Sequence, residues 1–576
     1  MNLRDNARHL LAYARPQWRM AAASVGFFIL GSAIEPLVPA LFKKLLDSGF
    51  QEGLKYPIWI VPIVVVGLFL ARGLANYAGA YALNSASSAT VLGLRRDLMR
   101  ALLRADAKVF THISPGIAVS KVINDPQFAI GGLSGALTTL LRDSTTLLFL
   151  LGYLFYLNWQ LTLVSLVTMP LLGLLVKLVQ RRLSKVGHEQ YQSQMRLVGM
   201  VDDNARAWRV VRTFDAAEFE YGRFEKEAVH QRRMVMKHIT AGALVTPLTQ
   251  VTASIGVAII LTLALWQASQ GQATVGEFVS FITALLMIIS PMRHLTDVYQ
   301  PITNSLISVG GAFELMNTPP EPETGDGELA RCRGEIDFEH VTLQYEGASQ
   351  PALNDLNLHI PAGQTVALVG SSGAGKTTVV SSLLRFAHPQ GGRILLDGVP
   401  IDTLKLANLR RHFAVVSQDI VLFDGSIAEN VAYAAPAGVD RDKVVACLRA
   451  ANLMSFIDTL PEGIDTAIGT NGSKLSGGQR QRLAIARALY RDAAVWIFDE
   501  ATSALDSESE SVVQHSIEEM RRSKTLILIA HRLSTIRNAD RIYVMAEGRV
   551  AEAGTHAELM ALGGIYAGLV RIQSAA

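Results

Sequence analysis

A glycine-rich stretch carries the first pattern with a defined chemistry. The segment "VALVGSSGAGKTTVV" fits G-x-x-x-x-G-K-[ST], between an apolar run typical of a buried strand and a helical segment. The alternative, an ordinary glycine-rich loop, does not require that context. The pattern predicts that backbone N–H groups surround phosphate oxygens, that Lys376 reaches the β- and γ-phosphates, and that the Thr377 hydroxyl binds Mg²⁺. The predicted phosphate-binding residues are Gly370, Ser371, Ser372, Gly373, Ala374, Gly375, Lys376, Thr377 and Thr378.

Two further apolar runs end in residues that could act on the same phosphates. "VWIFDE" ends in Asp499, placed to hold Mg²⁺, and Glu500, placed to polarise an attacking water. "TLILIAHR" brings His531 to the end of a second strand, where it could touch the γ-phosphate. The alternative roles are a helix N-cap for the acids and a structural role for the histidine. Together with the glycine-rich loop, these residues predict hydrolysis of a nucleoside triphosphate.

A third segment, "KLSGGQRQRLAIARAL", identifies the kind of phosphate site. Ser476, Gly477 and Gly478 open a long predicted helix, whose N-terminus would bind anions. Here the chain resembles the ATP-binding cassette (ABC) transporters, whose signature is LSGGQ, and the resemblance extends over the whole chain. It implies that two copies pair head to tail as a homodimer. Each ATP then lies between the phosphate loop of one copy and the signature of the other, where Ser476, Gly477, Gly478 and Gln479 contact it.

The resemblance assigns roles to further residues. Gln418 in "VVSQD" resembles the loop glutamine that binds near Mg²⁺ and senses the membrane domain, and Asp506 ends "SALD", which looks like the D-loop. Tyr345 matches the aromatic residue that stacks on adenine, with a core tyrosine as the alternative. One departure is Thr470 in "TAIGTNG", where exporters of this family usually carry Glu. We expect a charged contact to the partner's membrane helices to be absent or moved.

The composition indicates that the predicted ATP-binding domain is joined to a membrane domain. The chain has 576 residues, 50% of them hydrophobic and only 18% charged, with a net charge of +3. Soluble proteins average about a quarter charged residues, so the apolar excess points to a membrane. A bilayer core of ~30 Å needs about 20 helical residues. On this basis the uncharged runs before residue 315 predict six spans, at roughly 20–42, 57–80, 133–157, 160–180, 241–266 and 275–293.

The sequence pattern changes after a Pro/Glu/Gly-rich linker, "NTPPEPETGDGE". Beyond it, short β-rich runs alternate with helical segments, as in an α/β domain with buried strands. We therefore predict an all-α membrane domain over 1–316, a linker over 317–330 and an α/β P-loop domain over 331–576. The resemblance implies the type I ABC exporter fold, with membrane helices extended into the cytosol. The two cysteines lie far apart and predict neither a disulfide nor a cysteine zinc site.

The lysines and arginines predict the orientation in the membrane. Basic clusters precede the first span and fill the connections between spans two and three and between spans four and five. By the positive-inside rule both termini are cytosolic, although the first outer loop, with three lysines, is an exception. The two long inner connections have a helical period, and we expect elbows near 116–125 and 212–219 to contact another domain.

The membrane half points to a narrower family. "LFKKLLDSGF", "NWQLTLVSLV", "SPMRHLTDV" and "GALTTLLRD" resemble the MsbA-type flippases for lipid A and core lipopolysaccharide. The resemblance implies ATP-driven flipping of that lipid from the inner to the outer leaflet of a Gram-negative inner membrane. Alternatives are a multidrug or other-lipid exporter of the same fold, or an ATP-gated channel or regulator.

Three arginines lie at or near the predicted spans, namely Arg72, Arg142 and Arg293. An intramembrane cation costs several kcal/mol unless it is paired or hydrated. The resemblance implies that each contacts the glucosamine phosphates of lipid A, for which the planar arginine fork is suited. The alternative is internal pairing with Glu35 or Asp143. Asp143 adjoins Arg142, about 100° away on a helix, and we expect that pair to be poor.

Lys43 is the fourth candidate for the substrate. It lies at the outer end of the first predicted span. The resemblance suggests a contact with the sugar phosphates after flipping. A lysine at a helix end that extends toward the interface would have the same sequence position.

Overall fold

The computed structural model describes two units. Its described residues are 3–51, 57, 59–166, 169–243, 274–435, 438–499, 524–529 and 536–575, with scattered helical positions between 247 and 266. For 164–187 only the backbone is described, where it is described at all. The two units are Met1–Glu321 and Pro322–Ala576, so their boundary lies inside the predicted linker.

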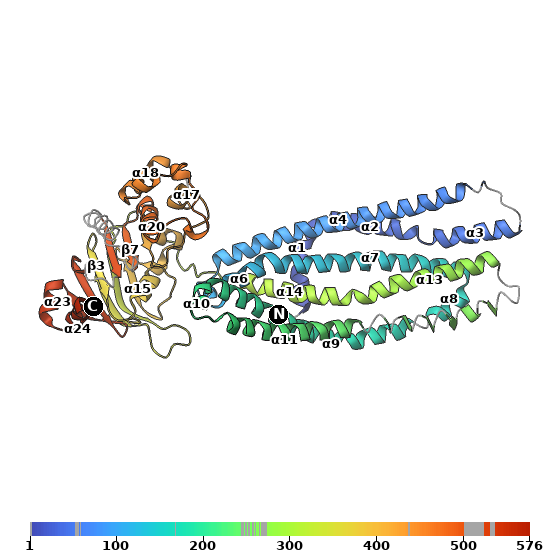
Figure 1. Ribbon diagram of the computed structural model, residues 1–576, viewed down its shortest axis with the longest axis horizontal. Helices are drawn as coiled ribbons and strands as arrows, with labels where there is room; N and C mark the ends of the chain where they lie inside the picture. The colour runs from blue at the N-terminus through green and yellow to red at the C-terminus, as the bar shows by residue number, and fades with distance from the viewer. Residues whose placement is uncertain are drawn as a thin grey trace. The chain divides into compact units, whose positions relative to one another are not determined.

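The first unit is helical, and its longer helices run side by side (Figure 1). Helix α4 packs against α2 and α7, α7 against α13 and α14, α13 against α3, and α9 against α11. The helices are α1 (Leu3–Ala14), α2 (Trp18–Ala33), α3 (Leu37–Gln51), α4 (Ile60–Arg104), α7 (Asp125–Leu157), α8 (Trp159–Leu166), α9 (Met169–Arg206), α11 (Ala217–Ala243), α13 (Val275–Asp297) and α14 (Tyr299–Met316).

Four stretches of the described chain are long and apolar enough to cross a membrane. They are Asp5–Ser48, Ile60–Arg104, Pro115–Leu157 and Val275–Met316. Each contains most or all of one predicted span. The predicted spans 160–180 and 241–266 lie largely outside the residues whose side chains are described, so the count of six stays a prediction.

Helix α4 shows why the bundle extends beyond a bilayer. It has 45 residues, which at ~1.5 Å per residue makes it roughly 68 Å long, about twice the hydrocarbon thickness. Its second half buries Leu94 and Leu98 against Val309 and Phe313 of α14. The helix ends at Arg104, where Ala105 becomes extended and bridges to Pro320.

Short elements join the long helices. Helix α6 (Pro115–Val119) runs through a π-helical turn, Ser120–Asn124, directly into α7, and α10 (Trp208–Thr213) lies between α9 and α11. Beside the first elbow, the Tyr191 hydroxyl of α9 donates to the Asp125 carboxylate of α7 at 2.6 Å. Burial and that carboxylate raise the pKa of Tyr191, so the hydroxyl keeps its proton. The contact fixes α9 against α7.

The second unit is built on two sheets. A four-stranded sheet has the order β2-β1-β4-β5, and a six-stranded sheet has the order β10-β9-β3-β8-β7-β6. The strands are β1 (Ile336–Leu343), β2 (Leu353–Ile360), β3 (Thr365–Val369), β4 (Gly391–Leu396), β5 (Val399–Pro400), β6 (Phe413–Val416), β7 (Val495–Asp499), β8 (Thr525–Ile529), β9 (Arg541–Ala546) and β10 (Arg549–Gly554).

The larger sheet confirms the predicted α/β architecture. Strands β9, β3, β8, β7 and β6 are mutually parallel, and every residue of β3 and β8 is buried. Such strands read as continuous apolar runs because both faces are covered. Apolar clusters pack on both faces, with Trp496 and Phe498 in one and Val495 and Ile497 in the other.

Candidate functional sites: a phosphate loop and a charged cavity

The glycine-rich segment forms a tight turn between β3 and helix α15 (Lys376–Leu383). Gly375 has φ +101°, and a Cβ there would lie 2.6 Å from the carbonyl oxygen of Ala352. Both the backbone conformation and the close approach require glycine. The turn therefore presents backbone N–H groups ahead of a helix N-terminus, as the sequence predicts.

Lys376 lies against the loop. Its side chain is buried, and Nζ donates to the carbonyl oxygens of Gly370 at 2.8 Å and Ser371 at 2.9 Å. Residues 371–373 and Thr377 are exposed. A phosphate arriving at this exposed side would meet the loop amides first, and the lysine would exchange a carbonyl for a phosphate oxygen.

The strand register places the predicted metal-binding residues at the same edge of the sheet. Asp499 of β7 and Leu368 of β3 both pair with Ile529 of β8, so Asp499 lies level with the end of β3. Gln418 is exposed two residues after β6, at the same carboxyl edge. The glycine-rich loop, the Asp499 carboxylate and the Gln418 amide thus lie along the carboxyl edge of the sheet, which is where parallel α/β sheets bind ligands. Glu500, Asp506 and His531 lie outside the described residues, and their roles remain predictions.

The signature segment opens helix α20 (Gly477–Arg491) with a complete capping box. The Ser476 hydroxyl accepts from the Gln479 amide at 3.2 Å, and the Gln479 side chain accepts from the Ser476 amide at 2.8 Å. Ser476 and Gly477 are exposed. This chain therefore holds the signature end of the helix in a fixed, accessible form.

Tyr345 and Thr470 are both exposed near the predicted nucleotide machinery. Tyr345 follows β1 by two residues and has 47% of its surface exposed, so it is not a core tyrosine. Thr470 begins a 3-10 turn, and its neighbour Asn471 accepts from the Leu422 amide at 3.0 Å. Sequence reasoning missed this role of Asn471, although an asparagine beside glycine is a signal for such a turn.

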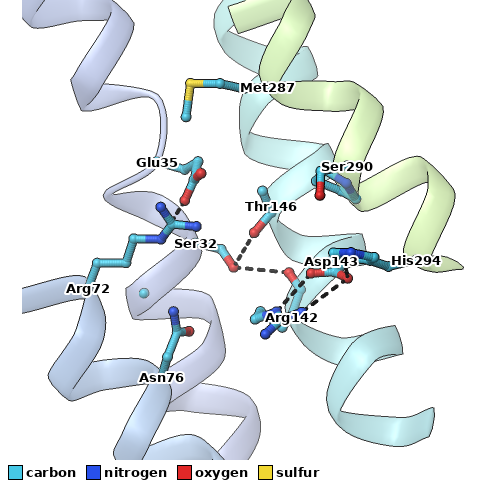
Figure 2. Close-up of a pocket in the computed structure, with 12 residues that line it drawn as sticks. Ser32, Glu35, Arg72, Asn76, Arg142, Asp143, Thr146, Met287, Ser290 and His294 are labelled. Carbon is cyan, nitrogen blue, oxygen red and sulfur yellow. Dashed lines mark hydrogen bonds and ion pairs between the residues drawn. The ribbon is translucent and has the colours of Figure 1, made fainter. Parts of the chain in front are cut away.

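A second site is a cavity of about 410 Å³ between the membrane helices (Figure 2). It is lined from α2, the turn after α2, α4, α7 and α13. The lining residues are Gly31, Ser32, Glu35, Arg72, Asn76, Arg142, Asp143, Thr146, Met287, Ser290, Pro291 and His294. Charged and polar side chains thus gather inside segments that are otherwise apolar.

Arg72 of α4 is paired across the cavity. Its Nε lies 2.7 Å from Oε2 of Glu35, and the Glu35 side chain is only 8% exposed, against 33% for Arg72. Glu35 occupies the turn between α2 and α3, which aims it at α4 (Figure 2). In this conformation the arginine faces an acid, as the internal-pairing alternative predicts.

The prediction that Arg142 and Asp143 pair poorly was wrong. Arg142 Nε and Nη2 donate to the two carboxylate oxygens of Asp143 at 2.8 and 3.3 Å. Adjacent Cβ atoms do diverge on a helix, but the long arginine side chain turns back and reaches its neighbour. Asp143 also accepts from His294 Nδ1 of α13 at 2.9 Å, so one carboxylate joins α7 to α13.

The structure places two of the four predicted substrate residues on the described lining of the cavity and leaves two off it. Arg72 and Arg142 line the cavity, whereas Arg293 is not among its described lining residues, and the adjacent His294 takes that place. Sequence reasoning missed His294. This histidine directly follows Arg293, so its place in a basic pair at the end of a predicted span was the available signal. Lys43 of α3 lies away from this cavity, with Nζ 3.0 Å from Oε1 of Glu277 on α13.

Two family models match the chain, one in each half. Residues 22–292 match the ABC transporter transmembrane region, and residues 353–503 match the ABC transporter family. The chain belongs to the ABC transporters. As such it is an ATP-driven membrane transporter.

Relatives of this ABC transporter match it over nearly the full length. It is 44% identical to an ATP-dependent lipid A-core flippase of Ralstonia nicotianae, over 99% of this chain and 96% of that one. It is 43% identical to the protein of the same name from Burkholderia orbicola, over 98% and 95%. A solved structure of a bacterial Atm1-family ABC exporter with ATP bound is also similar, with TM-score 0.80, 27% identity and coverage of 96% and 98%. The exporter fold is therefore shown.

The transporter's cavity is nearly balanced in charge. Among its described lining residues, two arginines face two carboxylates, and His294 adds a further cation only when protonated. Charges inside a membrane are tolerated when they pair in this way.

Proposed function

We propose that this transporter uses ATP to flip lipid A–core lipopolysaccharide from the inner to the outer leaflet of a Gram-negative inner membrane. The observation that carries the proposal is the arginine-containing cavity between membrane helices. Lipid A carries phosphates on a sugar head and acyl chains on the other side, so it suits a cavity whose arginines lie inside an apolar helix bundle. The full-length similarity to proteins named lipid A-core flippases supports the same substrate.

The exchange of ion pairs supplies a way to bind the head. With the cavity open to the inner leaflet, a substrate phosphate takes the place of the Glu35 carboxylate at Arg72 or of the Asp143 carboxylate at Arg142. Arginine can bind phosphate through two parallel N–H···O bonds, so the phosphate keeps the arginine paired while the displaced carboxylate has to find another partner or a proton. His294 then holds the displaced Asp143 carboxylate, because that contact is already present.

The ATPase half would drive the change of access. Two copies form a homodimer, and each nucleotide lies between the Lys376 loop of one and the Ser476 end of the other. Residues Thr377, Asp499 and Gln418 fit a Mg²⁺ ion by their oxygen chemistry and their shared sheet edge, and the ion would neutralise phosphate charge there. Glu500 polarises the attacking water. Both termini and this half lie on the cytosolic side.

ATPase activity in lipid nanodiscs tests the substrate. Purified transporter is assayed with and without lipid A, as wild type and as Arg72→Ala, Arg142→Ala and Arg293→Ala. Wild type should be stimulated, and the stimulation should be lost in the first two variants, which remove cations from the cavity. Because Arg293 is not among the described lining residues, its loss should have the smaller effect.

A matched control separates the cavity from arginine loss in general. Arg223→Ala removes an exposed arginine that forms an ion pair with Glu220 of its own helix, and it should leave the stimulation intact. Equal stimulation of all variants would instead favour a multidrug or other-lipid exporter. A single-channel current across a bilayer would favour a gated channel.

A further inference from the structure

Outside both sites, three metal-ligating side chains converge on the exposed face of the four-stranded sheet. They are Glu335, Asp337 and His359, and one ligand atom from each lies within 4.8 Å of the others. We propose that they form a binding site for a divalent transition-metal ion such as Zn²⁺, on the outer face of β1 and β2. Imidazole nitrogen with carboxylate oxygen is a ligand set that zinc accepts, with water completing four-coordination.

The strand register creates this cluster. Ile336 pairs with Ile360 and Phe338 with Leu358, and all four side chains are buried in the core. The pairing places Asp337 directly opposite His359 on the other face, where side chains alternate outward. Core packing therefore fixes the two ligands opposite each other, and a one-residue slip would expose four apolar side chains.

Glu335 joins the pair from the residue before β1. It precedes Asp337 by two positions and so projects to the same face. Its backbone is held on both sides by Asp397, whose Oδ1 accepts from the Glu335 amide at 2.8 Å and whose own amide donates to the Glu335 carbonyl at 2.8 Å. The third ligand therefore also comes from fixed backbone.

The side chains need only small shifts to bind an ion. Nδ1 of His359 lies 2.5 Å from Oδ1 of Asp337. Bonds of ~2.0–2.2 Å to a tetrahedral zinc place two ligand atoms about 3.4 Å apart. The histidine–aspartate pair must open slightly, and Glu335 must close in. All three side chains are partly exposed, at 51% for His359, 36% for Glu335 and 28% for Asp337, so rotation about their own bonds suffices.

The local charge also favours a cation. Two carboxylates share this face. Glu335 forms an ion pair with Arg333, whose Nη2 is 3.8 Å away and whose side chain is 75% exposed. Such a pair is weak in water. The Tyr543 hydroxyl donates to the His359 carbonyl and adds no positive charge. A metal ion would replace a weak surface pair with three direct bonds.

The chain supplies a matched control on the same two strands. Nδ1 of His340 on β1 lies 2.8 Å from Oδ1 of Asp355 on β2, also on the exposed surface, and the described part of the chain brings no third ligand to this pair. A histidine–aspartate pair alone should bind zinc far more weakly than three ligands. Comparison of His359→Ala with His340→Ala therefore tests the cluster while removing one histidine from each protein.

Zinc binding by the full-length transporter tests the proposal. Protein purified with a histidine-free tag and treated with chelator is titrated with Zn²⁺ against a fluorescent chelator, without nucleotide. Wild type and His340→Ala should each bind about one high-affinity ion per chain. His359→Ala should bind at least about tenfold more weakly, since even outer-shell changes cost zinc sites that much. Equal affinity of all three proteins would overturn the site.

A second variant guards against a folding artefact. Glu335→Gln leaves the His359–Asp337 pair intact and removes only the third carboxylate. It should lose the high-affinity ion while its thermal unfolding without zinc matches that of wild type. If Glu335→Gln binds zinc as tightly as wild type, the three-ligand site is refuted.

Discussion

The phosphate loop and the membrane cavity are built in opposite ways. The Lys376 side chain donates hydrogen bonds to loop residues five and six positions earlier in the chain. The cavity gathers residues from Gly31 to His294, on four helices and a turn, and its ion pair between Glu35 and Arg72 spans two of these elements. A local site is encoded in a motif, whereas a distributed site exists only once the helices are packed.

This difference decides how each site tolerates change. In the loop, glycine conformations and backbone donors do the binding, so single substitutions should abolish turnover without disturbing the bundle. In the cavity, charged side chains pair across helices, and under the proposed function the same side chains bind the substrate. Variants there should change stability and lipid stimulation together, unless both members of a pair are replaced.

The largest effect is expected at Glu500. Glu500→Gln removes the carboxylate that is predicted to polarise the attacking water but keeps the side-chain shape. ATP turnover should fall by about 10²–10⁴-fold, the usual contribution of a general base, while ATP binding persists. Single-turnover hydrolysis and equilibrium binding of labelled ATP check this. Normal turnover by the variant would refute the assignment of the base.

The next effect is expected at Gly375. Gly375→Ala combines φ +101° with a Cβ placed 2.6 Å from a backbone carbonyl, so the loop must move. ATP affinity should fall at least about tenfold, equivalent to ~1.4 kcal/mol, which is within the cost of such backbone strain. Gly363→Ala is the matched control, because φ is +73° and the Cβ would meet no atom within 4 Å. If both variants bind ATP alike, the close approach is unimportant.

The sequence predicted the loop better than the cavity, for a physical reason. Gly375 and Lys376 act through backbone conformation and neighbours close in the chain, which a motif specifies. Arg72 could be recognised as an intramembrane cation, but its choice between a phosphate and Glu35 depends on how the turn after α2 packs on α4. Glu500 and His531 remain sequence predictions, since they fall outside the described residues.

The positions of residues around a helix did not predict all the contacts in the cavity. They predicted divergence of Arg142 and Asp143, yet the flexible arginine spans that angle. The sequence analysis also named Arg293 and not its neighbour His294, which the structure places on the cavity lining. Side-chain length and the rotation of α13 against α7 settle these points, and neither is visible in a single sequence.

A middle-sized effect is expected for the pair across the cavity. Arg72→Ala leaves the buried Glu35 carboxylate without its cation, which should destabilise the bundle by about 1–3 kcal/mol. Arg72→Ala/Glu35→Gln should recover most of that stability but not the stimulation by lipid A. Thermal unfolding in nanodiscs and ATPase assays check the two properties separately. Recovery of both properties in the double variant would show that Arg72 serves packing alone.

The smallest effect is expected at the outer end of the bundle. Lys43 and Glu277 are 30% and 37% exposed, and their ion pair should contribute only about 0–1 kcal/mol. Glu277 also accepts from the Thr274 amide in a capping box at the start of α13, so Glu277→Gln keeps part of its bonding. Lys43→Gln and Glu277→Gln should therefore unfold within a few degrees of wild type.

Lipid stimulation then separates two roles of Lys43. If Lys43 contacts the sugar phosphates after flipping, Lys43→Gln lowers lipid-stimulated turnover while Glu277→Gln, which frees the lysine from its acid, does not. If Lys43 serves only the ion pair, both variants behave alike. The comparison works because each variant breaks the same contact but only one removes the cation. The same question, whether a charged side chain serves packing or substrate binding, is thus tested at Lys43, which belongs to neither the phosphate loop nor the cavity.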